Sequence, residues 1–503
     1  MLLYILFGYS LQIRLSLGFP ISFTLGFGFG NKDLILITNT ILYLIVRVGN
    51  GIFAFATLAL FTRLLSPSDY GVYALEMTIA SVLSTTLFQW IVVAVGRFYP
   101  AHIENPIKII SVATHVFWKI TILLALLFVI VFSFHNFFGV KPDHLVILFL
   151  ITVGLGLHSL ALQVANIQSA PFRYGMLSWA KSGGALIASL ILIYYGSVEL
   201  GALIGFAMGL VFSVLAFAPR DFVCMIPVSV DKRLSREMIR YGLPLILNFL
   251  GILVVDMSDR FMISRLLGSA DVAQYAVAYD LVQQSVGPCM NVLFLAAFPL
   301  IVKTHEEEGA VSGLKRLNSL GERLIAVGLP VSFIVGILSI DIAENVFGDN
   351  YRIEASAIMP WLAAAIFIGA IKSYCFDVAL QLRNEIKLQS YIAIVMALFN
   401  ITLNLFLLQK YGVIGSAWAT LAAFSIGALL SYFFSKSDLK LFLLVSVFMR
   451  SLLASSIMAI ILHQFASSSG LIWLIAKIIL GFLIYMVMAL LLNVADCRKL
   501  LKL

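Results

Sequence analysis

"RLLSPSDYGVYAL" (residues 63–75) and "RLLGSADVAQYAV" (residues 265–277) are two copies of one pattern, displaced by 202 residues. They match at Arg, Leu, Leu, Asp, Tyr and Ala. A second echo follows: Arg173 precedes a segment that ends in "YYG" (residues 194–196), and Arg383 precedes one that ends in "KYG" (residues 410–412). Since self-similarity at a fixed displacement marks repeat architectures, the chain consists of two related halves.

The composition indicates that each half crosses a membrane. Of the 503 residues, 61% are hydrophobic and 12% are charged, whereas soluble domains average about 45–50% apolar and about 25% charged residues. Apolar runs of about 20 residues, the length that spans a hydrocarbon core, recur along the chain. We therefore expect an all-α polytopic membrane protein with about 14 transmembrane helices. The predicted spans are residues 35–61, 72–95, 111–134, 145–165, 176–195, 201–218, 243–265, 272–300, 325–346, 357–378, 388–408, 415–434, 441–463 and 471–493.

Each repeat contains six of these helices, and two further helices follow the second repeat. Because six is even, both copies begin on the same side of the membrane, so an axis along the membrane normal relates them. This arrangement predicts two facing lobes around a central cavity near the midplane. The expected parts are an N-terminal segment (1–33), an N-lobe (34–219), a basic amphipathic linker (220–242), a C-lobe (243–434), and helices 13–14 with a tail (441–503).

The basic residues set the predicted orientation. With both termini cytoplasmic, 21 of the 33 Lys and Arg residues fall in inner segments, 5 fall in outer loops and the rest lie within spans, as the positive-inside rule requires. Topology therefore explains most of the formal charge of +8, and no nucleic acid partner is expected. The linker sequence "DKRLSREMIR" (residues 231–240) predicts a basic amphipathic helix on the inner leaflet, where anionic membrane lipid is the expected partner.

The N-terminal segment lacks the basic n-region and small-residue cleavage site of a signal peptide. No methionine occurs between Met1 and Met77. A translation start near Leu34 is therefore one hypothesis for this segment.

Enzymatic chemistry has little support in the sequence. The four cysteines are scattered without CxxC spacing, so neither a metal site nor a disulfide framework is expected. No GxxxxGK[ST] loop is present, and the short outer loops hold no cluster for acid–base work. We expect no catalytic residues and no cofactor.

Seven basic residues fall inside predicted spans, where each costs about 2.5–3.5 kcal/mol unless it is paired or functional. Arg47 lies about 12 residues, or ~18 Å, into the first span at 1.5 Å per residue, beside Asn50 and two glycines. It is the strongest candidate for lining a cavity, and Lys119 is as consistent with a cavity as with snorkelling. For Lys181, Lys372 and Lys477, near span ends, snorkelling to the interface is the favoured interpretation. The remaining two are Arg260 and Arg450.

Carboxylates inside spans are candidate carriers of a coupling ion, since burial favours protonation of such groups. The candidates are Asp256, Asp259, Asp280 and Glu76. The alternative is that they hydrogen-bond neighbouring helices and only hold a lobe together. A shift of 202 residues lays "DMSDR" (256–260) over the uncharged "AFATL" (54–58), so the fold itself does not demand these charges. Asp256 and Arg260 share one helical face and can neutralise each other, which leaves Asp259 without a partner in its own helix.

Short motifs indicate a family. "TRLLSPSDYGVYA" (62–74), "VGRFYP" (95–100), "YGLPLILNFL" (241–250) with "DRFMISRLLG" (259–268), and "YGVIGSAWAT" (411–420) resemble the polysaccharide transport family. This family contains Wzx-type O-antigen flippases and belongs to the superfamily of multidrug (MATE) exporters and lipid II flippases, known as MOP.

The resemblance implies a flippase in the bacterial or archaeal cell (inner) membrane. Its cargo would be an undecaprenyl-pyrophosphate-linked oligosaccharide, moved from the cytoplasmic to the periplasmic leaflet by alternating access of the two lobes. Such cargo serves O-antigen and lipopolysaccharide, capsule or exopolysaccharide synthesis, which implies polysaccharide assembly proteins as partners. Arg47 and Arg260 would meet pyrophosphate, and Asp256 or Asp259 would couple to a proton or sodium ion. The alternative function is a multidrug or small-metabolite cation-coupled antiporter of the same fold.

Overall fold

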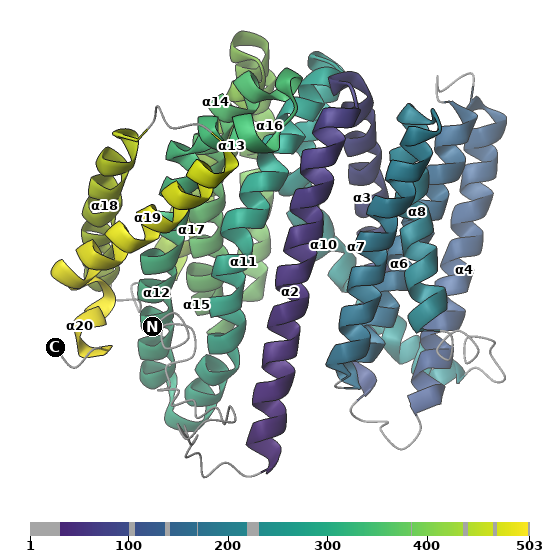
Figure 1. Ribbon diagram of the computed structural model, residues 1–503. Helices are drawn as coiled ribbons and strands as arrows, with labels where there is room; N and C mark the ends of the chain where they lie inside the picture. The colour runs from purple at the N-terminus through teal and green to yellow at the C-terminus, as the bar shows by residue number, and fades with distance from the viewer. Residues whose placement is uncertain are drawn as a thin grey trace, which may run out of the picture. The chain divides into compact units, whose positions relative to one another are not determined.

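The computed structural model describes residues 31–99, 106–135, 141–168, 170–218, 231–383, 385–435, 441–465 and 470–500. Most of the predicted N-terminal segment, residues 220–230 of the predicted linker and the last three residues lie outside this part of the chain. Within it, every regular element is a helix, and no strand occurs (Figure 1). Thirteen of these helices are long and apolar enough to cross a membrane. The all-α polytopic membrane fold is confirmed.

By contacts between its elements the described part of the chain divides into two compact units, within residues 33–276 and within residues 277–503. The helices of the first unit are α2 (Asn31–Leu64), α3 (Pro67–Phe98), α4 (Pro106–Ser133), α6 (Pro142–Ile167), α7 (Pro171–Tyr194), α8 (Val198–Phe217) and α10 (Lys232–Leu266). The division falls inside α11 (Ser269–Glu308), whereas the repeat divides the sequence near residue 220. The assignment of six spans to each lobe therefore stays a prediction.

The second unit continues with α12 (Ala310–Ile337), α13 (Ser339–Val346), α14 (Arg352–Ile371), α15 (Asp377–Leu382), α16 (Ile386–Tyr411), α17 (Val413–Phe434), α18 (Leu441–His463), α19 (Leu471–Leu491) and α20 (Cys497–Leu500). Two predicted spans are interrupted. The ninth, expected as one helix over 325–346, ends at Ile337 and resumes as α13. The tenth contains one π-helical turn, Lys372–Phe376, between α14 and α15, a type of irregularity that often marks functional sites.

The repeat motif makes the same helix–turn–helix in both copies. Helix α2 ends at Leu64 and α3 begins at Pro67; helix α10 ends at Leu266 and α11 begins at Ser269. Both pairs of boundaries are displaced by the same 202 residues as the motif. The two turns also touch each other, since Gly71 lies directly against the backbone carbonyl of Ser269. The sequence repeat is thus a structural repeat.

The second repeated pattern, an arginine before a helix that ends in a Tyr-Gly pair, also has a structural counterpart. Arg173, at the start of α7, donates from Nε to the carbonyl of Phe217 at 3.0 Å, and Arg383 donates from Nη1 to the carbonyl of Ser435 at 2.9 Å. Both arginines therefore bind the C-terminal end of the helix one span later, where unpaired carbonyls and the helix dipole favour a cation. The glycines of "YYG" and "KYG", Gly196 and Gly412, have positive φ angles of 95° and 63°, a conformation that favours glycine.

The core of the first unit is built around α3. One cluster joins α3, α4 and α6 through buried residues that include Phe88, Trp90 and Phe117, with Phe88 and Phe117 stacked at 4.3 Å between ring centroids. Leu234 and Met238 of α10 belong to the same cluster.

The predicted linker helix is therefore not a separate element, because residues 232–242 are the first turns of α10. Its amphipathic character is present: Leu234 and Met238 are buried, while Lys232, Arg233, Arg236 and Arg240 are exposed. Asp231 caps this helix and pairs with Lys108 at 2.7 Å. The hydrogen bond from Lys108, followed by the backbone N–H of Leu234, lowers the pKa of Asp231 to about 2.

Substituting Gly71 with alanine should destabilise the protein. The added Cβ would lie 1.7 Å from the Ser269 carbonyl oxygen, so the two turns must separate, at a cost of about 1–3 kcal/mol for overpacking of this kind. Thermal unfolding of the detergent-purified protein, followed by intrinsic fluorescence, measures the effect. Gly51→Ala is the matched control, because a Cβ there meets nothing within 4 Å and alanine favours a helix. Equal melting temperatures for the two variants would contradict this packing.

Candidate functional site

Asp259 is the most deeply buried acidic side chain among the predicted site residues whose side chains the structure describes, with 1% of its surface exposed. It accepts a 2.5 Å hydrogen bond from the hydroxyl of Tyr275. Tyr275 belongs to the repeat motif in α11, so the two residues face each other across the turn between α10 and α11. Burying a carboxylate without a hydrogen bond carries a large desolvation penalty, and the hydrogen bond from Tyr275 offsets part of it.

The sequence identified Asp259 but missed Tyr275. The residue equivalent to Tyr275 in the first repeat is Tyr73, which packs edge-on against Phe61 at 5.4 Å, and the residue equivalent to Asp259 is Thr57. Thr57 donates its hydroxyl to the carbonyl of Phe53 in its own helix. The carboxylate that Tyr275 contacts is thus specific to the second repeat, because the first repeat has Thr57 at the equivalent position. Tyr275 is part of the repeated motif, but the sequence does not show which way its side chain points.

Arg260 follows Asp259 and contacts a different helix. Its Nη1 donates to Thr78 Oγ1 at 3.1 Å, and Thr78 in turn donates to the carbonyl of Ala74 in α3. The side chain of Asp256 lies outside the described residues, so its predicted neutralisation of Arg260 stays a prediction. The stretch 259–260 thus connects α10 to α3 and to α11.

Glu76 pairs with a histidine. Its Oε1 contacts Nδ1 of His144 at the start of α6, and the two side chains are 12% and 8% exposed. His144 was missed because a sequence places it only at a predicted loop end, with no indication of its distance from Glu76. An acid and an imidazole in contact can share and transfer a proton.

Helix α2 carries two further candidates, Arg47 and Asn50. Its Val46 carbonyl accepts a 3.1 Å hydrogen bond from the Trp179 indole of α7, and Gly49 lies against the same indole. This contact fixes which face of α2 packs on α7, and Arg47 stays exposed. Asn50 is half-buried, and its Oδ1 is buried without a hydrogen-bond partner among the described residues.

The last two candidates are Lys119 and Asp280. Lys119 is exposed on α4 and makes no hydrogen bond or ion pair within the described part of the chain. Asp280 is half-buried on α11, in the second unit. The described residues also contain no group of three side chains suited to a metal ion.

Two lysines behave differently from the prediction. Lys372 is 6% exposed and pairs with Asp377 at 2.7 Å, while Ser431 donates to the other carboxylate oxygen at 2.7 Å. Lys477 is 2% exposed and pairs with Asp341 at 2.7 Å. The interpretation that both snorkel to the interface is wrong, because each finds a carboxylate partner that makes burial possible. Nothing in the sequence joins Lys477 to a residue 136 positions away.

A family model described as "Polysaccharide biosynthesis protein" matches residues 36–305, more than half of the chain. The chain belongs to this family. It is the family of Wzx-type flippases, and its members are transporters of lipid-linked substrates rather than enzymes. This membership confirms the resemblance read from the motifs, and together with the many apolar helices it identifies a multi-pass membrane protein.

Solved structures support the same fold. The inward closed conformation of the lipid II flippase MurJ is similar with a TM-score of 0.70 and 16% identity, over 92% of this chain and 100% of that chain. An inward-facing multidrug resistance MATE transporter of the MOP superfamily gives a TM-score of 0.62 and 14% identity, over 79% and 97%. A MATE crystal structure in complex with MaD3S gives 0.56 and 13%, over 81% and 96%. No curated protein sequence matches the chain. These likenesses establish the flippase and exporter fold for this family member.

The Glu76–His144 contact should be energetically coupled. Removing either partner leaves the other buried, which costs about 1–3 kcal/mol, so Glu76→Ala and His144→Ala together should destabilise by less than the sum of the single variants. A double-mutant cycle on unfolding in denaturant measures a coupling of about 0.5–3 kcal/mol for contacting residues. The exposed pair Lys303–Glu307, 67% and 63% exposed, is the control and should couple by less than about 0.5 kcal/mol. Additive effects of E76A and H144A would exclude the pair.

Proposed function

We propose that this protein is a flippase that moves an undecaprenyl-pyrophosphate-linked oligosaccharide from the cytoplasmic to the periplasmic leaflet of a bacterial or archaeal cell (inner) membrane. The product would serve O-antigen and lipopolysaccharide, capsule or exopolysaccharide synthesis. Family membership supports the lipid-linked cargo. The cargo has a polar sugar head, a doubly anionic pyrophosphate and a lipid tail, so the protein must offer it cationic and polar groups within the bilayer.

The observation that carries this proposal is the exposure of Arg47 in the middle of α2. The helix runs from residue 31 to residue 64, and the α7-facing side at Val46 and Gly49 is covered. An arginine within a span costs about 2.5–3.5 kcal/mol on insertion scales, so arginines at such positions are usually functional or paired. Its guanidinium matches the bidentate geometry of phosphate oxygens. In the proposed mechanism Arg47 binds the pyrophosphate, with Arg260, Lys119 and Asn50 contributing further polar groups.

The proposed energy source is a proton or sodium gradient coupled through carboxylates. Asp259 is the leading candidate, with Asp256, Asp280 and Glu76 as further carriers. The hydrogen bond from Tyr275 supports this role, because it holds the carboxylate in one orientation and changes in strength with protonation. Alternating access of the two repeats would then expose the cargo to one leaflet at a time. The competing cation-coupled antiporter needs no phosphate-binding arginine. The two functions therefore predict different effects of replacing Arg47.

Replacing Arg47 tests the cargo. In cells that lack the native gene, Arg47→Ala should reduce surface polysaccharide at least tenfold and cause the lipid-linked precursor to accumulate, because the pyrophosphate loses its bidentate partner. Arg47→Lys should be less affected, since it retains the charge. The control is Arg63→Ala, which removes a cation from the last turn of the same helix. Normal polysaccharide from R47A at native expression would refute the phosphate-binding role.

Replacing Asp259 tests the coupling. Asp259→Asn can still accept the hydrogen bond of Tyr275 but cannot carry a charge, so we expect a melting temperature close to that of the wild type and at least a tenfold loss of transport. Transport into vesicles under an imposed proton or sodium gradient distinguishes the two ions. The same change at the exposed Asp143 serves as the control and should leave transport unaltered. Gradient-driven transport by D259N at the wild-type rate would remove Asp259 as a carrier.

A further inference from the structure

A pocket of about 470 Å³ lies in the second unit, where the ninth predicted span breaks into α12 and α13. It is lined by residues of α13, the first turns of α14 and the residue that caps α19, namely Ile340, Ala343, Glu344, Asn345, Arg352, Ile353, Ser356 and Gly470. The charge pattern of the sequence predicts that this end of the helices faces outward. The volume falls within the range of pockets that hold small organic ligands.

The walls of this pocket are held in place. Phe347 and Tyr351, in the turn between α13 and α14, are fully buried. On the other side, the Lys477–Asp341 ion pair ties α19 to α13, and the Tyr485 hydroxyl donates to the carbonyl of Ala326 in α12 at 2.7 Å. The appended helix therefore forms a fixed wall, and a ligand would enter a preformed site without the entropic cost of ordering it.

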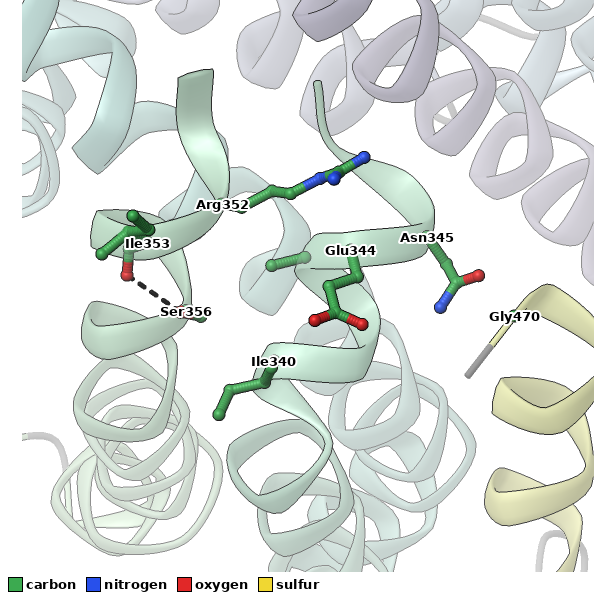
Figure 2. A pocket seen from close by; sticks show the side chains of 8 residues that line it. Ile340, Glu344, Asn345, Arg352, Ile353, Ser356 and Gly470 are labelled. Carbon is green, nitrogen blue, oxygen red and sulfur yellow. Dashed lines mark hydrogen bonds between the residues drawn. The ribbon is translucent and has the colours of Figure 1, made fainter. Parts of the chain in front are cut away.

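The polar groups of the pocket include both acceptors and donors (Figure 2). Glu344 is exposed, and its carboxylate makes no hydrogen bond or ion pair with the described residues. Ser356 donates to the carbonyl of Ile353 at 2.9 Å, which leaves its oxygen able to accept. Asn345 donates from Nδ2 to the carbonyl of Asp341 at 2.8 Å, and in Figure 2 its amide points toward Gly470. These groups suit the hydroxyls of a sugar.

The charged residues that line the pocket disfavour an anionic ligand. Arg352 donates from Nη2 to Asp349 at 2.7 Å and from Nε to the carbonyl of Phe347 at 3.3 Å, so its charge already has a carboxylate partner. Glu344 is then the only lining charge without a counterion among the described residues, and a carboxylate repels phosphate. The exposed side chains of Ile340 and Ile353 add apolar surface for the C–H faces of a ring.

We propose that this pocket binds an uncharged sugar residue of the oligosaccharide after it reaches the outer side, as a second site distinct from the pyrophosphate-binding residues. The proposal rests on the proposed flippase function and adds to it the chemical class of the group bound. Glu344 accepts hydroxyl hydrogen bonds, Arg352 and Asn345 donate, and the isoleucines cover the ring. The site retains the released head group near the appended helices.

Sugar binding can be measured apart from translocation. The full chain in lipid nanodiscs is mixed with glucose, galactose, N-acetylglucosamine and a neutral disaccharide, each at millimolar concentration, and saturation-transfer NMR reports which ring protons contact the protein. We expect transfer to at least one sugar. The signal should fall at least fivefold in Glu344→Gln, which removes the charge, and in Ser356→Phe, which fills the pocket. The control Glu354→Gln changes an exposed glutamate of α14, the helix that carries Ser356, and this glutamate does not line the pocket.

The possible outcomes are distinct. Transfer that is lost in E344Q and S356F but retained in E354Q supports the proposal. No transfer to any sugar, transfer unchanged in both pocket variants, or competition by inorganic phosphate would each overturn it. Translocation of lipid-linked oligosaccharide is assayed separately on the same variants, so that failure of the flippase function appears as lost transport in the wild type, whatever the sugar result.

Discussion

The central constraint on this structure is that no water is available inside a bilayer to satisfy a polar group, so each must find its partner within the protein. The described part of the chain meets this constraint repeatedly with pairs of side chains. Within one span Lys372 pairs with Asp377. Between helices, Tyr275 donates to Asp259, His144 contacts Glu76 and Lys477 pairs with Asp341. These interhelical pairs join α10 to α11, α3 to α6, and α19 to α13. The positions of the helices and the positions of the charges are therefore consequences of one another.

The two repeats share their helix boundaries and some backbone contacts, but not their charged residues. The shared features are the matching turns at Leu64–Pro67 and Leu266–Ser269 and the matching arginine contacts at Phe217 and Ser435. Asp259 occupies a position at which the first repeat has a threonine that bonds only to its own helix. The symmetric contacts therefore account for what the two repeats share, whereas the contact of Asp259 with Tyr275 is specific to the second repeat.

The two appended helices, α18 and α19, pack against the other helices of the second unit. Tyr485 reaches the backbone of α12, Ser451 contacts the Tyr485 hydroxyl at 2.8 Å, and Lys477 reaches α13. Asp341, which pairs with Lys477, lies in the first turn of α13 after the break between α12 and α13, and α13 also lines the pocket. The interruption, which a hydropathy pattern cannot detect, thus lies next to the contact with α19.

The sequence by itself determined the class of the protein. Composition and run length identified a helical membrane protein, the displacement of 202 residues located the repeated turns, and the motifs indicated the family that the comparison confirmed. It also selected Asp259 and Glu76 as unusual, because burying a charge in a span is expensive wherever the helix packs. Only the tertiary structure decided their partners. Tyr275 and His144 became neighbours through helix rotation and packing, which depend on the sum of many small contacts, and Lys477 met Asp341 across 136 residues. Local periodicity records which residues must be buried, but not which residue of another helix they will touch.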